Sequence, residues 1–437
     1  MSWFLAINIT TAQVNWILEE KASMPMATSN NAVTAVEVGG MRYVYSFAGI
    51  DTTLIYSGIH LKAFRYDLAN DTWDTIPDVP DSIGKIAAAA STIKNRIYLV
   101  GGYYVASNGD ETSSDDVHIL DPQTDQWLPD GQKLPVVTDD HFQSVWRDSL
   151  LYVIGGWSDS TPGPVGGGNI INVQIYHPET DSWMQGTPMP NTNDYKTFGA
   201  SGVIIDDTIY IAGGVHDNWP FEIVPNLRIG LIDPQQPDSI QWSFIQDSSA
   251  NIYRSAGSAY KGMPIWFGGA GNAYNFDGIE YGTGNPVEPL KQILTYNPSN
   301  SQFSVSSSGM MPMDLRGAAR IDDHSFVLAG GMMAEQEASS KTYFIWDGIV
   351  NSLNQQHDSY IFVSPNPVKE DLVLKQTGGL MNVTVKMYDV LGRLLFSGEL
   401  NDNSTVISCR NYPNGLYLLL LEIGNGDKVI EKIIVQK

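Results

Sequence analysis

Basic side chains recur at a similar place in successive segments of this sequence and are the residues best suited to bind an anion. Each lies 14 to 17 residues before a pair of small residues that ends an apolar run. Asp140, Asp314 and other acidic or phenolic residues stand close to them. Arginine in particular holds a carboxylate through two parallel hydrogen bonds. The five positions are Lys85, His141, Lys196, Arg254 and Arg316.

Aromatic and polar side chains near the same positions complete a predicted binding face. Aromatic rings beside polar groups suit the stacking of a sugar ring. We therefore expect a face that binds a glycan or an acidic peptide. Neighbouring carboxylates leave a second interpretation open, in which they only neutralise the repulsion between the basic groups. The further predicted contact residues are Trp157, Tyr195, His216, Trp219 and Tyr253.

Other functional classes have little support in the sequence. The net charge of −23 argues against nucleic-acid binding, which depends on Lys and Arg contacts to phosphates. The single cysteine, Cys409, excludes an internal disulfide framework and Cys-ligated zinc ribbons. Seven scattered histidines contain no HExxH pattern, and there is no GxSxG motif and no P-loop. The sequence therefore predicts no metal and no cofactor.

Repeated segments must position these side chains. Six small-residue pairs lie 53 to 62 residues apart, and a Tyr or Asp turn followed by an aromatic residue recurs between them. Runs rich in β-branched and aromatic residues precede each pair, so each unit is expected to hold four short strands. A period near 50 residues with four strands is typical of a propeller blade. The pairs are Ala48-Gly49, Gly101-Gly102, Gly155-Gly156, Gly213-Gly214, Gly268-Gly269 and Gly330-Gly331.

The glycine pairs and the Tyr…Trp pattern together resemble the kelch repeat over residues 1–350. The resemblance implies an all-β, six-bladed kelch-type β-propeller. Trp16 precedes the first pair, whereas no Trp strand follows the sixth, so the N-terminal strand is expected to complete the last blade. Such closure protects an edge strand that would otherwise be exposed.

Kelch-type propellers also resemble two classes of enzyme. A copper oxidase of the galactose oxidase type needs a propeller cysteine, which is absent upstream of Cys409. The N-acetylneuraminate mutarotases remain an alternative. By that resemblance Arg254 and Arg316 hold the sugar carboxylate, and a loop glutamate moves the proton. The candidates for that role are Glu222, Glu280 and Glu335. A structural or adhesion surface protein is the third interpretation.

The last part of the chain has a different composition. Residues 359–437 hold eight acidic and eight basic residues, and all 11 Trp lie upstream. We therefore expect a propeller over 1–350, a linker over 351–358 and a small immunoglobulin-like antiparallel sandwich over 359–437. The strings SPNP, YDVLGR, PNGLY and KIIVQK resemble the C-terminal sorting domain of the type IX secretion (Por secretion) system.

This resemblance implies interaction with that secretion machinery and a secreted or cell-surface protein of a Bacteroidetes-type bacterium. No apolar run reaches the roughly 18 to 20 residues of a membrane-spanning helix. The first residues lack the basic and apolar regions of a signal peptide, so we expect that the export signal is missing from the given chain.

Overall fold

The computed structural model describes residues 14–163, 166–348, 360–377, 383–390, 392–400, 404–422 and 428–437. The chain divides into two compact units, residues 1–348 and 349–437, and each is described by itself. The predicted linker, residues 351–358, lies outside the described residues. No helix in the described ranges has the length and apolar character needed to cross a membrane.

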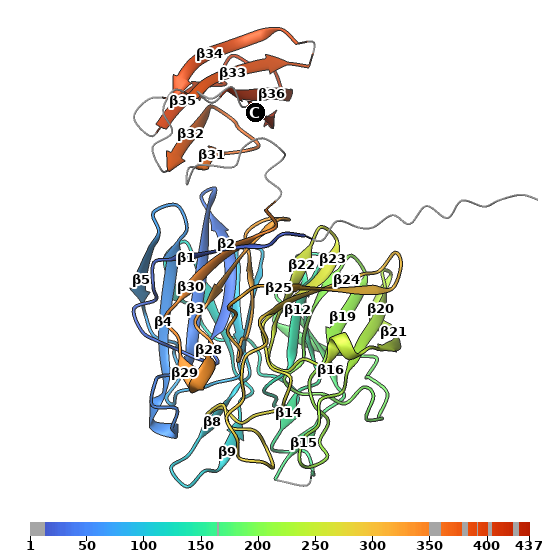
Figure 1. The fold of residues 1–437 in the computed structure, drawn as a ribbon. Coiled ribbons are helices and arrows are strands. Elements are labelled where there is room, and N and C mark those ends of the chain that lie inside the picture. Colours follow the sequence, from blue (N-terminus) through green and yellow to red (C-terminus); the bar gives the residue numbers. More distant parts are fainter. Residues whose placement is uncertain are drawn as a thin grey trace, which may run out of the picture. The chain divides into compact units, whose positions relative to one another are not determined.

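Six four-stranded antiparallel sheets make up most of the described part of the first unit (Figure 1). In five of them the four strands follow one another along the chain, with small hairpins inserted in some connections. This arrangement confirms the predicted all-β fold. The sheets are β2 (Ala32–Val38), β3 (Met41–Ile50), β4 (Ile59–Asp67), β5 (Thr72–Ile76); β6 (Ala89–Ile93), β7 (Arg96–Val100), β10 (Val117–Asp121), β11 (Gln126–Trp127); and β12 (Phe142–Trp146), β13 (Leu150–Ile154), β16 (Val173–His177), β17 (Ser182–Gly186). They continue with β18 (Ser201–Ile205), β19 (Thr208–Ala212), β20 (Asn226–Asp233), β21 (Gln236–Gln246); β22 (Ala256–Tyr260), β23 (Met263–Phe267), β24 (Gln292–Asn297), β25 (Gln302–Ser307); and β26 (Ala319–Arg320), β27 (Ser325–Ala329), β30 (Thr342–Trp346), β1 (Ile17–Lys21).

Among the described residues of the first unit, three short hairpins and three 3₁₀ turns lie between the strands of the sheets. The hairpins β8–β9 and β14–β15 project from the same end of this unit (Figure 1). They matter for function because they carry side chains that line a cavity described below. The elements are β8 (Tyr103–Val105), β9 (Glu111–Ser113), β14 (Trp157–Ser158), β15 (Gly168–Asn169), β28 (Met332–Met333), β29 (Glu337–Ala338), η1 (Tyr56–Gly58), η2 (Ser248–Ala250) and η3 (Ala334–Gln336).

Strand β1 joins the two ends of the first unit. It pairs with β30 in antiparallel register, with Ile17 opposite Trp346 and Lys21 opposite Thr342. Trp16 is buried beside Tyr260, with ring centroids 4.9 Å apart. The N-terminal strand β1 therefore completes the sheet formed by β26, β27 and β30 and covers its outer edge.

The glycine pairs let neighbouring sheets approach closely. Gly213 has φ 66, and a Cβ placed there would lie 2.0 Å from the carbonyl oxygen of Ile252. A residue with a side chain fits neither this backbone conformation nor this space. Apolar side chains from adjacent sheets fill the remaining volume, for example Tyr152 and Ile211 in one core cluster. The repeated glycines thus allow neighbouring sheets to pack closely around an axis.

The described part of the second unit forms two sheets around one core. The core includes Leu374, Val385, Leu419 and Cys409, all fully buried. Side chains from both sheets meet there, as expected for an antiparallel sandwich. The strands are β31 (Tyr360–Ser364), β32 (Asp371–Thr377), β35 (Ser404–Ser408) in one sheet and β34 (Leu394–Leu400), β33 (Val383–Asp389), β36 (Gly415–Glu422), β37 (Lys428–Val435) in the other.

Candidate functional site

A ring of six residues, one from each four-stranded sheet, surrounds the axis of the first unit. All six have a left-handed backbone, with φ between 48 and 65. Backbone bonds join neighbours in the ring: the amide of Gly199 donates to the carbonyl of Asp140, and the amide of Arg254 donates to that of Gly199, both at 2.8 Å. In five sheets the ring residue lies two positions before the innermost strand. The ring residues are Asn30, Ala87, Asp140, Gly199, Arg254 and Asp314.

Four side chains at this ring form a buried ion-pair cluster. Arg254, 1% exposed, donates from Nη2 to Asp140 Oδ2 at 2.7 Å and from Nη1 to Asp314 Oδ1 at 3.3 Å. Arg316 also donates to Asp140, and its Nε donates to Asn30 Oδ1 at 2.9 Å. Two guanidinium groups therefore face two carboxylates. The predicted basic charge at this position is neutralised by the protein's own acidic residues.

Two cavities meet at the ring. The axial channel, about 360 Å³, is lined by the innermost strands together with His141, Arg254 and Arg316. The loop cavity, about 670 Å³, is lined by the β8–β9 and β14–β15 hairpins and by later loops. Arg254 borders both, so the ring and its ion pairs separate them. A volume of 670 Å³ is within the range of small-molecule binding sites.

Aromatic rings form one wall of the loop cavity. Trp157 packs edge-on against Phe198 and Phe221, with centroids 5.3 Å and 5.7 Å apart. Phe221 in turn contacts Tyr281 at 4.9 Å and Trp219 at 5.3 Å. Trp219 is 55% exposed although it is large and apolar. The wall therefore offers open aromatic surface to a ligand.

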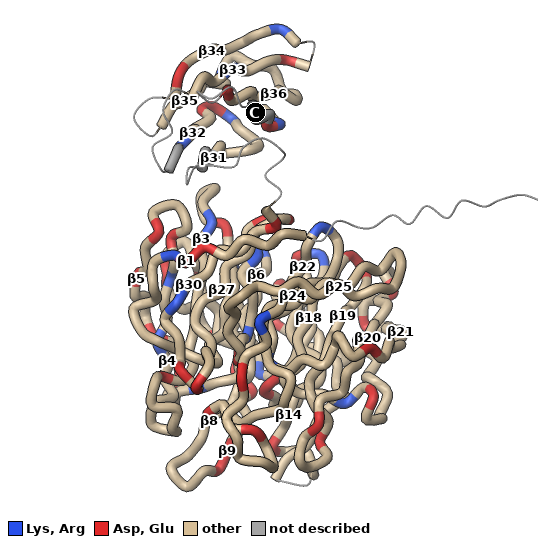
Figure 2. The backbone as a smooth tube through the Cα atoms, viewed as in Figure 1, with Lys and Arg blue, Asp and Glu red and all other residues tan. Residues whose placement is uncertain are grey.

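Carboxylates form the other part of the loop cavity, and acidic positions are visible around the β8–β9 hairpin and β14 in Figure 2. Asp139 is 4% exposed and accepts a 2.6 Å hydrogen bond at Oδ2 from the hydroxyl of Ser113. Burial raises the pKa of Asp139 to about 8 and that of Glu111 above its ordinary value. Asp139 can therefore give or take a proton near neutral pH. The acidic lining residues are Asp110, Glu111, Asp139, Asp140 and Asp159.

The structure brings three of the five predicted basic residues together and places the other two elsewhere. Arg254, Arg316 and His141 meet at the axial channel. Burial lowers the pKa of His141 to about 4, so its imidazole is neutral. Lys196 instead pairs with Asp217 at 3.2 Å and lines neither cavity.

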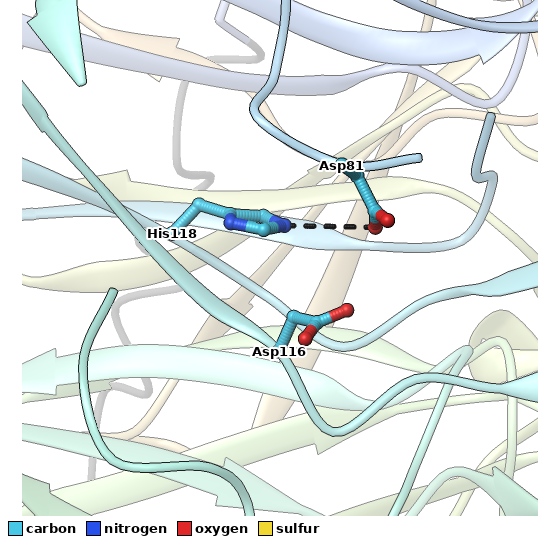
Figure 3. A group of neighbouring side chains, drawn as sticks. All are labelled: Asp81, Asp116 and His118. Atoms are coloured by element: carbon cyan, nitrogen blue, oxygen red, sulfur yellow. Dashed lines mark ion pairs between the residues drawn. The ribbon is translucent and has the colours of Figure 1, made fainter. Parts of the chain in front are cut away.

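Lys85 is buried in a separate cluster with Asp81, Asp116 and His118, and Figure 3 shows the last three side chains. Its ammonium contacts Asp81 at 2.6 Å, Asp116 at 3.2 Å and His118 Nε2 at 3.2 Å. Asp81, Asp116 and His118 are the described residues with metal-ligand geometry. The Lys85 ammonium already supplies a positive charge to all three. Lys85 is therefore paired within this cluster and lines neither the axial channel nor the loop cavity.

The predicted aromatic and polar contacts are similarly divided. Trp157 and Trp219 line the loop cavity. Tyr253 is fully buried beneath Arg254, with the guanidinium carbon 5.1 Å from its ring centroid. Tyr195 packs against Phe244 at 5.4 Å. His216 Nδ1 accepts a hydrogen bond from the Asn218 amide, and the residue is outside the cavity lining.

Sequence reasoning missed Glu111, Asp139 and Tyr281. Asp139 directly precedes Asp140 in the sequence, but its burial results from the packing of several blades. Glu111 begins β9, in a hairpin with no counterpart in most repeats. A polar hairpin that interrupts the repeat is the one signal by which the sequence marks this region.

Comparisons with known proteins agree with the geometry. The kelch motif model matches residues 87–129 and 147–190, and the model of a secretion system C-terminal sorting domain matches residues 362–436. This is a secreted kelch-repeat protein. Its C-terminal domain addresses it to secretion machinery.

Two relatives resemble this kelch-repeat protein at low sequence identity. The Kelch-like protein terF of Aspergillus terreus is 26% identical over 304 residues, which cover 68% of this chain and 59% of that protein. The human Kelch repeat and BTB domain-containing protein 12 is 25% identical over 41% of this chain and 29% of its own length. The chain thus spans less than two thirds of these relatives.

A solved structure supports the fold of the kelch unit. It is titled "Structure of YjhT", has a TM-score of 0.58 and 16% identity, and the match covers 77% of this chain and 99% of that one. At this identity the match shows the fold alone.

Proposed function

We propose that the kelch propeller is a carbohydrate-binding module whose site is the loop cavity. The observation that carries the proposal is the pairing of an open aromatic wall with hydrogen-bonding carboxylates in a space of about 670 Å³. Sugar rings present apolar faces to aromatic groups and hydroxyls to carboxylates. The cavity supports a neutral or basic ligand better than the acidic one expected from the sequence, because its basic residue, Arg254, is already paired.

A glycan-array screen of the full chain tests this proposal. Trp219→Ala removes exposed aromatic surface from the cavity and should weaken binding of any retained glycan at least about tenfold, which corresponds to about 1.4 kcal/mol. Tyr56→Ala is the matched control, since Tyr56 is also an exposed aromatic residue, 45% accessible, but lies outside the cavity. Equal binding by both variants, or an array without any binding, would contradict the proposal and favour a structural or adhesion role.

A second candidate is proton-transfer catalysis on the bound sugar, the isomerase alternative. Asp139 supports it, because a buried carboxyl with a pKa near neutrality suits an acid–base role. The glutamates expected for this role, Glu222, Glu280 and Glu335, do not line the cavity. Faster anomer exchange in NMR spectra of a sugar that binds, lost in Asp139→Asn, is the expected result. An unchanged exchange rate would leave only the binding function.

A further inference from the structure

Phe221 has a backbone conformation that is unusual for a bulky residue. Its φ is 68, and it is the only aromatic residue among the described residues with a left-handed backbone. A side chain of this size is strained in that region, which glycine and asparagine enter more easily. Such strain persists where the surrounding structure enforces it, and it concentrates at ligand-binding sites. Phe221 lines the loop cavity, so its strained backbone belongs to the proposed site.

The loop that carries Phe221 is held from two sides. The amide of Phe221 donates to the carbonyl of Asn218 at 2.8 Å and closes the turn that contains Trp219. Pro220 packs against Gly282, where an added Cβ would lie 2.8 Å from the Pro220 Cβ. The Phe221 side chain itself is 6% exposed and belongs to a buried apolar cluster. Its ring is therefore fixed by the packing around it.

The Phe221 ring contacts two tryptophans that lie on different elements. Trp157 from β14 and Trp219 from the loop before β20 each meet Phe221 edge-on, with interplanar angles of 87° and 72°. The other ring contacts of the two indoles, with Phe198 and Tyr281, are also edge-on. Among the described residues, the two indoles do not contact each other and no ring is stacked flat on either. Phe221 therefore holds apart two indoles whose faces no other ring covers.

The separation of the two indoles restricts the kind of ligand. A sugar ring stacks its apolar face on one aromatic ring. Trp157 and Trp219 line the same cavity but are separate platforms, so a single sugar ring uses one of them, whereas a chain of sugar rings uses both. Two linked contacts on one ligand strengthen binding without a change in either contact.

We propose that Phe221 is a positioning residue for Trp157 and Trp219, and that the loop cavity therefore selects oligosaccharides of two or more sugar rings over single sugars. The inference rests on the proposed carbohydrate-binding function and names its ligand class. The strained backbone directs the Phe221 ring to both indoles, and the ring sets the spacing that a chain of sugars has to match.

Calorimetric titration of the full chain with monomers and linear tetramers of glucose, galactose, mannose and N-acetylglucosamine tests the selection. We expect a tetramer to bind at least about tenfold more tightly than its monomer, which exceeds the statistical advantage of four equivalent sugar units. Phe221→Leu should reduce this ratio several-fold by weakening the tetramer more than the monomer. Phe64→Leu is the matched control, because Phe64 is also buried, at 3% exposure, and lies outside the cavity lining.

Fluorine NMR of the full chain labelled with fluorotryptophan tests the positioning role without a ligand. Trp157→Phe and Trp219→Phe assign the two resonances. We expect Phe221→Leu to shift both resonances, because the Phe221 ring contacts each indole, and Phe64→Leu to leave both unchanged. Phe221→Tyr keeps an aromatic ring and should preserve both the resonance positions and the affinity ratio.

The outcomes that overturn the inference are distinguishable from failure of the proposed function. If a monomer binds as tightly as its tetramer, or if the array retains glycans but no tetramer binds, the selection is wrong while carbohydrate binding stands. Resonances that Phe221→Leu leaves unchanged would remove the positioning role. If no tetramer binds and the glycan array is also silent, the proposed function fails together with the inference.

Discussion

Replacing Asp140 by asparagine tests whether the ring is held together by its buried charges. The change leaves two guanidinium groups facing one carboxylate, Asp314, at a site where Arg254 is 1% exposed. Asn tolerates the left-handed backbone of this position, with φ 49, so the perturbation is mainly electrostatic. Removing one partner of a buried ion pair typically costs about 3 to 5 kcal/mol. We expect a loss of this size in the free energy of unfolding.

Urea unfolding followed by tryptophan fluorescence is the suitable assay. All 11 Trp precede residue 349, so the signal reports the propeller and not the sorting domain. Asp206→Asn is the matched control, because Asp206 has φ 51 and is exposed. Its effect should stay within about 0.5 kcal/mol.

A double variant separates charge from packing. Adding Arg316→Gln to Asp140→Asn restores the balance of one guanidinium and one carboxylate, and should recover at least about 1 kcal/mol. A loss below about 1 kcal/mol in the single variant, or no recovery in the double variant, would refute the assignment of a charge-balanced cluster.

Three further predictions concern stability. The folded pKa of Asp139, about 8, lies above its unfolded value, so the stability that this group contributes is full at acidic pH and is lost as the pH rises through about 8. For one group the slope of this decline is at most about 1.4 kcal/mol per pH unit. Asp139→Asn should flatten the decline in unfolding curves recorded from acidic to basic pH. An equal decline in the variant would assign it to other groups, Glu111 among them. Gly213→Ala should lower the free energy of unfolding by more than about 1 kcal/mol, because its backbone has φ 66 and the Cβ would meet a carbonyl; a neutral effect in the same assay would contradict the close-packing role. Deleting residues 1–21 removes β1 and exposes the edge of β30, so cooperative unfolding should be lost and the protein should associate during size-exclusion chromatography; a stable monomer would show that β1 is dispensable.

The fold could be predicted because its signal repeats. Gly213 and its counterparts, four glycines and Ala48, mark the ends of strands where neighbouring sheets approach closely, and six such pairs reveal the six sheets. The position of Trp16 ahead of the first pair indicated that the N-terminal strand pairs with the last one. These patterns are local, because the glycine or tryptophan that forms each pattern is also the residue that the packing requires at that position.

The site could be predicted only in part, because it depends on register and on loops. Lys85 and Lys196 are two and three positions before their ring residues, whereas Arg254 is itself a ring residue. In extended chain a shift of one residue turns a side chain to the opposite face, so counting back from a glycine pair does not fix direction. The pairing of Arg254 with Asp140 spans 114 positions and has no local signature. The cavity carboxylates lie partly on an inserted hairpin, which no repeat pattern describes.

The most direct test of the loop cavity as the functional site is a crystal structure of the full chain with the glycan that binds most tightly on the array. We predict that the sugar ring lies against Trp219 and Tyr281, with its polar groups toward Glu111 and Asp139. A sugar found in the axial channel, or on the outer strands of the sheets, would contradict this account.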